Sequence, residues 1–119
     1  MARATSAPAR KARKNKLFSK TKGYFQARNN RLRQAHQAVM KAESYAYRGR
    51  KERKRQFRRL WIVRINAALK PHSMRYSQFI HGLKLAEIEL DRKILSGLAV
   101  SDPEAFGVLV NQAREALEG

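Results

Sequence analysis

The chain has 119 residues and a net charge of +18, a length that suits about one domain. It contains no cysteine, which excludes a disulfide framework and a thiolate metal site. No apolar run approaches the roughly 20 residues of a membrane span, and no apolar segment follows the basic N-terminus as it would in a secretory signal.

The positive charge is concentrated in the first part of the chain. Residues 1–70 hold 22 lysines and arginines against two acids, a net charge of +20, whereas residues 71–119 hold five against seven, a net charge of −2. A strongly basic segment of this kind is typical of nucleic-acid-binding proteins. An anionic membrane is the other common partner of such a charge.

Residues 1–24 mix small residues with cations and have little apolar content. Pro8 suits the first turn of a short helix capped near Ser6, and Gly23 would end it. We expect this segment to bury too little apolar surface to fold alone.

Residues 25–70 are predicted to be helical throughout, and Pro71 should end the helix. The helix has a narrow apolar stripe with steps of three and four residues: Leu32, Ala35, Val39, Ala42 and Ala46. A weak coiled-coil seam is one interpretation of this stripe. The other is that its alanines let another backbone come close.

Residues 57–119 have helical apolar stripes that could close one modest core. They are Phe57, Trp61, Ile65 and Leu69; Tyr76, Phe79, Ile80 and Leu83; Ile94, Leu95 and Leu98; and Phe106, Leu109, Val110, Ala113 and Leu117. Asp91 is a predicted N-cap, and Ser101 with Glu104 a predicted capping box. The predicted fold is all-α: a long basic N-terminal helical extension, residues 1–56, followed by a small four-helix globular domain, residues 57–119.

The densest run of charge is AYRGRKERKRQFRRLWIVRINAA, residues 46–68. It holds eight cations close together: Arg48, Arg50, Lys51, Arg53, Lys54, Arg55, Arg58 and Arg59. On a helix they form eight like-charge pairs three or four residues apart, which cost about 2–4 kcal/mol in isolation. Since they fall at all azimuths, with Glu52 as the sole acid, we expect anions on several sides of the helix, as folded nucleic acid supplies.

Aromatic residues lie among the cations: Phe18, Tyr24, Phe25, Tyr45 and Tyr47. They could stack on unpaired bases or pack within the protein. Trp61, at the start of the apolar stripe, is predicted to belong to the core rather than to a stacking surface.

No pattern in the sequence indicates an enzyme. The three histidines, His36, His72 and His81, share no metal-ligand spacing, the acids show no paired acid–base arrangement, and the known nucleophile and phosphate-loop motifs are missing. We therefore predict no catalytic residue, no metal ligand and no cofactor.

Three blocks resemble the bacterial-type family of large-subunit ribosomal protein number twenty. They are the run at 46–68, YSQFIHGLKLAEIELDRKILSGLAV at 76–100, and KGYFQAR at 22–28. The resemblance covers nearly the whole chain. The chain departs from the family in its alanine-rich first 20 residues, and Gln26 stands where the family commonly has glycine.

The resemblance implies an all-helical structural constituent of the large ribosomal subunit, cytoplasmic and without enzymatic activity. Its basic extension would thread into large-subunit ribosomal RNA, and its globular domain would dock on the RNA surface beside neighbouring ribosomal proteins. It would promote early subunit assembly. Some family members also bind their own messenger RNA, a partner that the resemblance leaves open here. No membrane and no small-molecule substrate is implied.

The predicted RNA-binding residues come from the basic pattern and from the resemblance. They are Arg10, Lys11, Arg13, Lys14, Lys16, Lys20, Lys22, Tyr24, Arg28, Arg31, Arg33, Arg48, Arg50, Lys51, Arg53, Lys54, Arg55, Arg58, Arg59 and Arg64, with Ser77, His81 and Lys84 in the globular domain. Most contacts should be to phosphate, with specificity coming from RNA shape.

Two other classes of protein compete with this reading. A nucleoid-type architectural DNA-binding protein would need a dimer, a groove-reading helix or an intercalating wedge, and the sequence shows neither a symmetric dimer seam nor a proline wedge. A membrane-active basic helix would need large apolar residues beside the charge, but here they begin only after the charged run ends.

Overall fold

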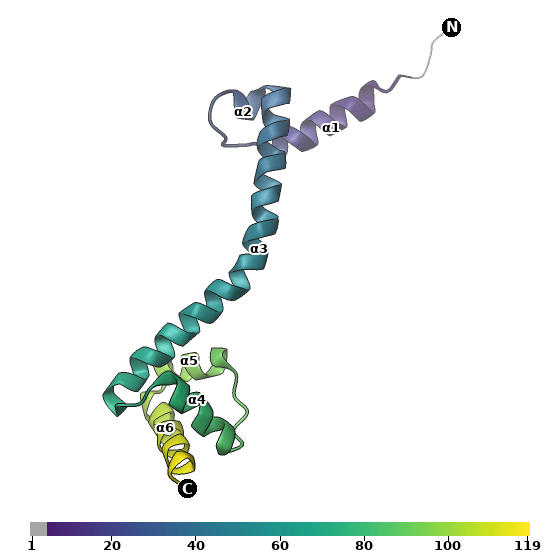
Figure 1. Ribbon diagram of the computed structural model, residues 1–119. Coiled ribbons are helices and arrows are strands. Elements are labelled where there is room, and N and C mark those ends of the chain that lie inside the picture. The colour runs from purple at the N-terminus through teal and green to yellow at the C-terminus, as the bar shows by residue number, and fades with distance from the viewer. Residues whose placement is uncertain (1–4) are drawn as a thin grey trace. The chain divides into compact units, whose positions relative to one another are not determined.

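A computed structural model describes residues 5–119, which form six α-helices and one 3-10 helix, without strands (Figure 1). The all-α prediction is confirmed for this part of the chain. The chain divides into two compact units, Met1–Lys51 and Glu52–Gly119. The predicted boundary between residues 56 and 57 stays a prediction, and residues 1–4 of the predicted extension lie outside the described part.

Helix α1, Ala7–Lys20, begins as the sequence predicts. Ser6 is its N-cap residue and Pro8 lies in its first turn, although the Ser6 side chain makes no capping hydrogen bond. After the helix, the hydroxyl of buried Thr21 donates to the carbonyl oxygen of Phe18 at 3.3 Å. Gly23 follows with φ +86°, a left-handed conformation that glycine adopts without steric cost.

The predicted single helix over residues 25–70 is wrong at its N-terminal end. Helix α2, Ala27–Asn30, is a single short turn, and α3 begins at Leu32 and ends at Leu69. Arg31 between them is extended, with φ −102° and ψ 125°, and Gln26 has φ +50° and ψ −130°. These residues belong to the turn through which the chain passes from α1 into α3, so a tertiary requirement overrides the local helical pattern.

The narrow apolar stripe of α3 is used over a short stretch in the first unit. Ala35 and Val39 are buried and Ala42 is half-buried, whereas Leu32 and Ala46 are exposed. Side chains of α1 and of α3 line one groove, so the stripe packs within this unit. The close approach of another backbone to its alanines stays a prediction.

The second unit has one hydrophobic core, built around the last turns of α3. The other contributing helices are α4, Tyr76–Leu85; α5, Arg92–Ser101; and α6, Pro103–Glu118. The buried cluster consists of Ile65, Leu69, Phe79, Leu83, Leu95, Phe106, Val110 and Ala113. The rings of Phe79 and Phe106 pack tilted with their centroids 5.4 Å apart. α3 ends two residues before Pro71, which lies in the 3-10 helix Lys70–His72.

The helix starts in this unit show one correct and one wrong capping prediction. The Asp91 carboxylate accepts from the backbone N–H of Ile94 at 2.8 Å, as predicted. The box of Ser101 and Glu104 is wrong, because Asp102 caps α6 by accepting from the N–H of Ala105 at 3.0 Å. Ser101 instead ends α5, donating its hydroxyl to the carbonyl oxygen of Gly97 at 2.9 Å.

Candidate nucleic-acid interface

The predicted RNA-binding side chains lie on the surface of the described residues. All of them are exposed except Tyr24, which is half-buried. The cations from residue 10 to residue 20 lie on α1, Lys22 and Tyr24 lie in the turn after it, and Arg28 lies on α2. Arg33 and the later cations up to Arg64 lie on α3, and Ser77, His81 and Lys84 lie on α4.

Acidic partners for these cations are scarce. Within residues 5–119 the one ion pair joins Lys20 Nζ to Glu43 Oε1 at 2.5 Å. Glu52 therefore pairs with neither Arg48 nor Arg55, the two cations it could have relieved. The basic run of α3 thus leaves its charge for an external anion.

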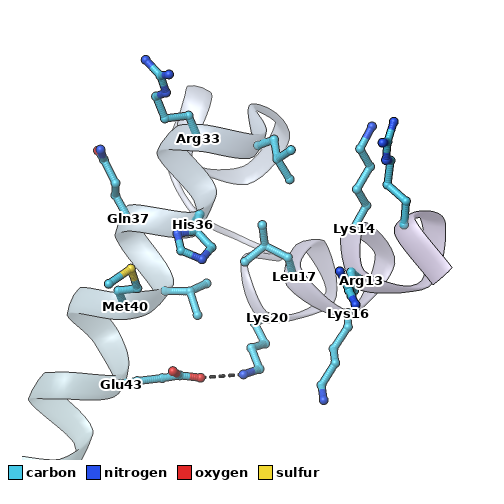
Figure 2. A pocket seen from close by; sticks show the side chains of 13 residues that line it. Arg13, Lys14, Lys16, Leu17, Lys20, Arg33, His36, Gln37, Met40 and Glu43 are labelled. Carbon is cyan, nitrogen blue, oxygen red and sulfur yellow. Dashed lines mark hydrogen bonds and ion pairs between the residues drawn. The ribbon is translucent and has the colours of Figure 1, made fainter. Parts of the chain in front are cut away.

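A groove lies between α1 and α3 in the first unit. It encloses about 790 Å³. Leu17, Val39 and Met40 contribute apolar surface, while Arg13, Lys14 and Lys16 are among the cations that line it. Figure 2 shows Leu17 pointing from α1 toward α3, and the Lys20–Glu43 pair joining the two helices. Cations from both helices therefore lie around a small apolar surface.

The pKa of Glu43 is lowered from its ordinary value by this arrangement. The largest cause is the hydrogen bond that Lys20 donates, followed by the positive charge of Lys20, and the charge of Lys16 adds to it. Because both side chains are exposed, water screens the pair, and its contribution to the stability of the unit is small.

Two tyrosines on α3 lie beneath cations. Lys41 and Arg48 are 5.2 and 5.8 Å from the ring centroid of Tyr45, and Lys51 is 4.5 Å from that of Tyr47. These distances suit cation–π contacts, which hold the cations near the helix surface. Phe25, in the turn before α2, is 77% exposed, and no cation among residues 5–119 makes such a contact with its ring.

Trp61 does not belong to the core, so that prediction is wrong. The side chain is half-buried and lies outside the buried cluster and outside the residues packed against it. α3 contributes to the core only from Ile65 onward. Trp61 instead lines a second groove with Phe57 and with Arg92 and Lys93 of α5.

Arg92 and Lys93 are candidate interface residues that sequence reasoning missed. The signal was present in the triplet Asp91-Arg92-Lys93, but it was interpreted only as a helix start. Their proximity to α3 could not be predicted without the fold.

Neither a metal centre nor a membrane span is found in the described part of the chain. No three or more His, Asp or Glu side chains there come together to hold a metal ion. None of the described helices combines the length and the apolar character needed to cross a bilayer.

These features define a small, all-helical, basic protein whose surface complements a polyanion. A family model described as Ribosomal protein L20 matches residues 3–109. The chain belongs to this ribosomal protein family.

Curated relatives agree over nearly the full length. The large ribosomal subunit protein bL20 of Roseiflexus sp. (strain RS-1) is 54% identical over 117 residues, which cover 98% of this chain and 100% of the relative. The protein of the same name from Rubrobacter xylanophilus is 49% identical over 119 residues, covering 100% of this chain and 90% of the relative.

Proposed function

We propose that this chain is a structural constituent of the large ribosomal subunit that binds large-subunit ribosomal RNA directly and promotes early subunit assembly. It has no enzymatic role. The observation that carries the proposal is the set of exposed, unpaired cations on α1 and α3, in a chain of the L20 family. The family match favours this function over that of a nucleoid-type DNA-binding protein.

The mechanism is electrostatic and geometric. Arg53, Arg55, Arg58 and Arg59 are all exposed on α3 and spread around its axis, since each residue turns by about 100°. Their charges can meet phosphates on several sides and release the counterions that RNA binds. A helix held between RNA segments offsets the repulsion between those segments, which is how a small basic protein promotes assembly.

The remaining predicted contacts extend this interface. The cations that line the groove between α1 and α3 would contact phosphates, and Ser77, His81 and Lys84 on α4 would dock the second unit on the RNA surface. Residues 1–56 are assigned as the RNA-threading extension and residues 57–119 as the docking domain. In the cytoplasmic subunit, neighbouring ribosomal proteins would be further partners.

Co-sedimentation with large ribosomal subunits after a high-salt wash tests the proposal, and retention is the expected result. A gel-shift series should show tighter binding to structured ribosomal RNA than to duplex DNA at matched salt. Equal binding to both would favour the architectural DNA-binding alternative. Partition onto anionic vesicles tests the membrane alternative. Adding the leader of the chain's own messenger RNA to the same gel-shift series tests whether that messenger is also a partner.

A further inference from the structure

The groove beside Trp61 lies within the second unit, between α3 and the start of α5. It encloses about 780 Å³, within the size range of pockets that hold small ligands. Its aromatic lining consists of Phe57 and Trp61, whose ring centroids are 6.2 Å apart with a tilt of 39°. The Phe57 side chain is 47% exposed, so this aromatic pair is accessible from outside.

The aromatic pair is not explained by the hydrophobic core. Phe57 lies about two helical turns before Ile65 and Trp61 about one, and the contribution of α3 to the core begins at Ile65. A large aromatic surface left partly open at this point of α3 loses the benefit of burial. An external flat group would restore it.

Cations surround the aromatic pair. Arg53, Lys54, Arg55 and Arg58 of α3 line the groove, as do Arg92 and Lys93 of α5. Arg92 is held in place because its Nε donates to the hydroxyl of Tyr76 at 2.7 Å. The acid in this lining, Asp91, already accepts the N–H of Ile94 as a helix cap. The positive charge of the lining therefore favours an anionic ligand, and the aromatic pair favours one with a flat apolar part.

We propose that this groove takes an unpaired nucleobase of RNA, which stacks on Trp61 and Phe57 while its flanking phosphates contact Arg58, Arg92 and Lys93. This rests on the proposed function and names the part of the RNA that the groove recognises. Bases in a duplex have their faces stacked on each other, whereas a base in a loop or bulge presents its face to aromatic side chains. The groove thus recognises an irregular RNA site, and the basic helices bind phosphates.

The test uses the full chain, because Trp61 is its one tryptophan and its fluorescence reports on this groove alone. A short oligouridylate, whose bases stack little on one another, and a blunt-ended RNA duplex are titrated separately at high salt, where phosphate contacts are screened. The single strand should quench Trp61 strongly, and the duplex should bind without comparable quenching. Binding of both RNAs is followed independently by the anisotropy of a label on the RNA.

Variants separate stacking from charge. Trp61→Ala and Phe57→Ala should each weaken binding of the single strand about 5- to 150-fold, while duplex binding changes less than about twofold. Trp61→Phe keeps an aromatic face and should recover most of the affinity. Val63→Ala is the matched control, since Val63 is 62% exposed on the same helix and does not line the groove.

Phe57→Ala keeps the test valid if Trp61→Ala does not fold, because Phe57 is about half exposed. Equal quenching by the single strand and the duplex, or unchanged single-strand affinity in both alanine variants, would overturn the inference. If the protein still binds structured ribosomal RNA in that case, the proposed function stands. If it binds neither single strand nor structured ribosomal RNA, the proposed function fails as well.

Discussion

Gly82 of α4 lies directly against the backbone of Ala113 of α6. A Cβ atom at position 82 would come within 2.3 Å of the carbonyl oxygen of Ala113, and within 2.9 Å of its Cβ. Both residues are buried, and the blocking atom belongs to a helix backbone that cannot turn aside. The two helices pack this closely because position 82 has no side chain.

Replacing Gly82 with alanine should therefore destabilise the second unit. Overpacking of this kind costs about 1–3 kcal/mol or more, which exceeds the 0.5–1 kcal/mol or so that alanine gains over glycine in a helix. Thermal unfolding followed by circular dichroism measures the change. Gly97→Ala in α5 is the control, because nothing lies within 4 Å of its added Cβ, and it should be stabilising by about 0.5–1 kcal/mol. Equal effects of the two substitutions would contradict the close approach.

The conformation of Gln26 predicts a stabilising substitution. Its φ of +50° and ψ of −130° lie in a region that suits glycine, and a side chain held there costs about 1–3 kcal/mol. Glycine loses more conformational entropy on folding than other residues do, which offsets part of the relieved strain. Gln26→Gly should therefore stabilise the first unit by about 0.5–2 kcal/mol. Amide exchange of α1 and the start of α3 measures it. Gln26→Ala keeps the strain and should change stability by less than about 0.5 kcal/mol.

The arginines of α3 should act on binding rather than on stability. Replacing Arg53, Arg55, Arg58 or Arg59 singly with alanine should reduce the slope of RNA affinity against salt by about 1. A peptide of residues 40–70 carrying the same changes should be no less helical, because each change removes like-charge repulsion. Lys70→Ala, a nearby cation outside the predicted contacts, should leave the slope unchanged. A sharp loss of helicity with an unaltered slope would make these arginines structural.

The ion pair between Lys20 and Glu43 predicts a pH dependence in the first unit. The pKa of Glu43 is lower in the folded chain than its ordinary value. The ion pair therefore stabilises the first unit fully above the ordinary carboxyl pKa. This stabilisation is lost as the pH falls through the lowered pKa of the folded chain. The protection of the α1 amides against exchange, corrected for the intrinsic exchange rate at each pH, should therefore fall on acidification in that acid range, more in the native chain than in Glu43→Gln. Carboxyl NMR shifts of Glu43 should show its pKa rising in Lys20→Met; no rise would rule out Lys20 as the cause.

Local signals in the sequence predicted those features that depend on a few neighbouring residues. The start of α1 near Ser6 and Pro8, the Asp91 cap and the apolar stripes of α4 and α6 needed no knowledge of the fold. Asp102 was overlooked as a cap because Ser101 offered the better-known pattern, yet the residue before a proline is disfavoured in a helical conformation. This makes Asp102 a natural N-cap.

Features set by distant parts of the chain could not be predicted. Neither Gln26 nor Arg31 is a helix-breaking residue type, so the break before α3 has no local signal in the sequence. Trp61 continues the stripe of Ile65 and Leu69 in sequence, but the core of the second unit begins one turn later. The groove beside Trp61 needed the start of α5 to be placed near α3.

The order of the elements along the chain has a consequence for synthesis. The core of the second unit requires Phe106, Val110 and Ala113 from α6, whereas the excess of cations lies within residues 1–70. A growing chain therefore presents nearly all of its basic residues before its core can close. Since synthesis adds about 5–20 residues each second, these cations are available to anions for some seconds while the second unit is still incomplete. The first interactions of a newly made chain are thus set by its charge, and its globular fold follows.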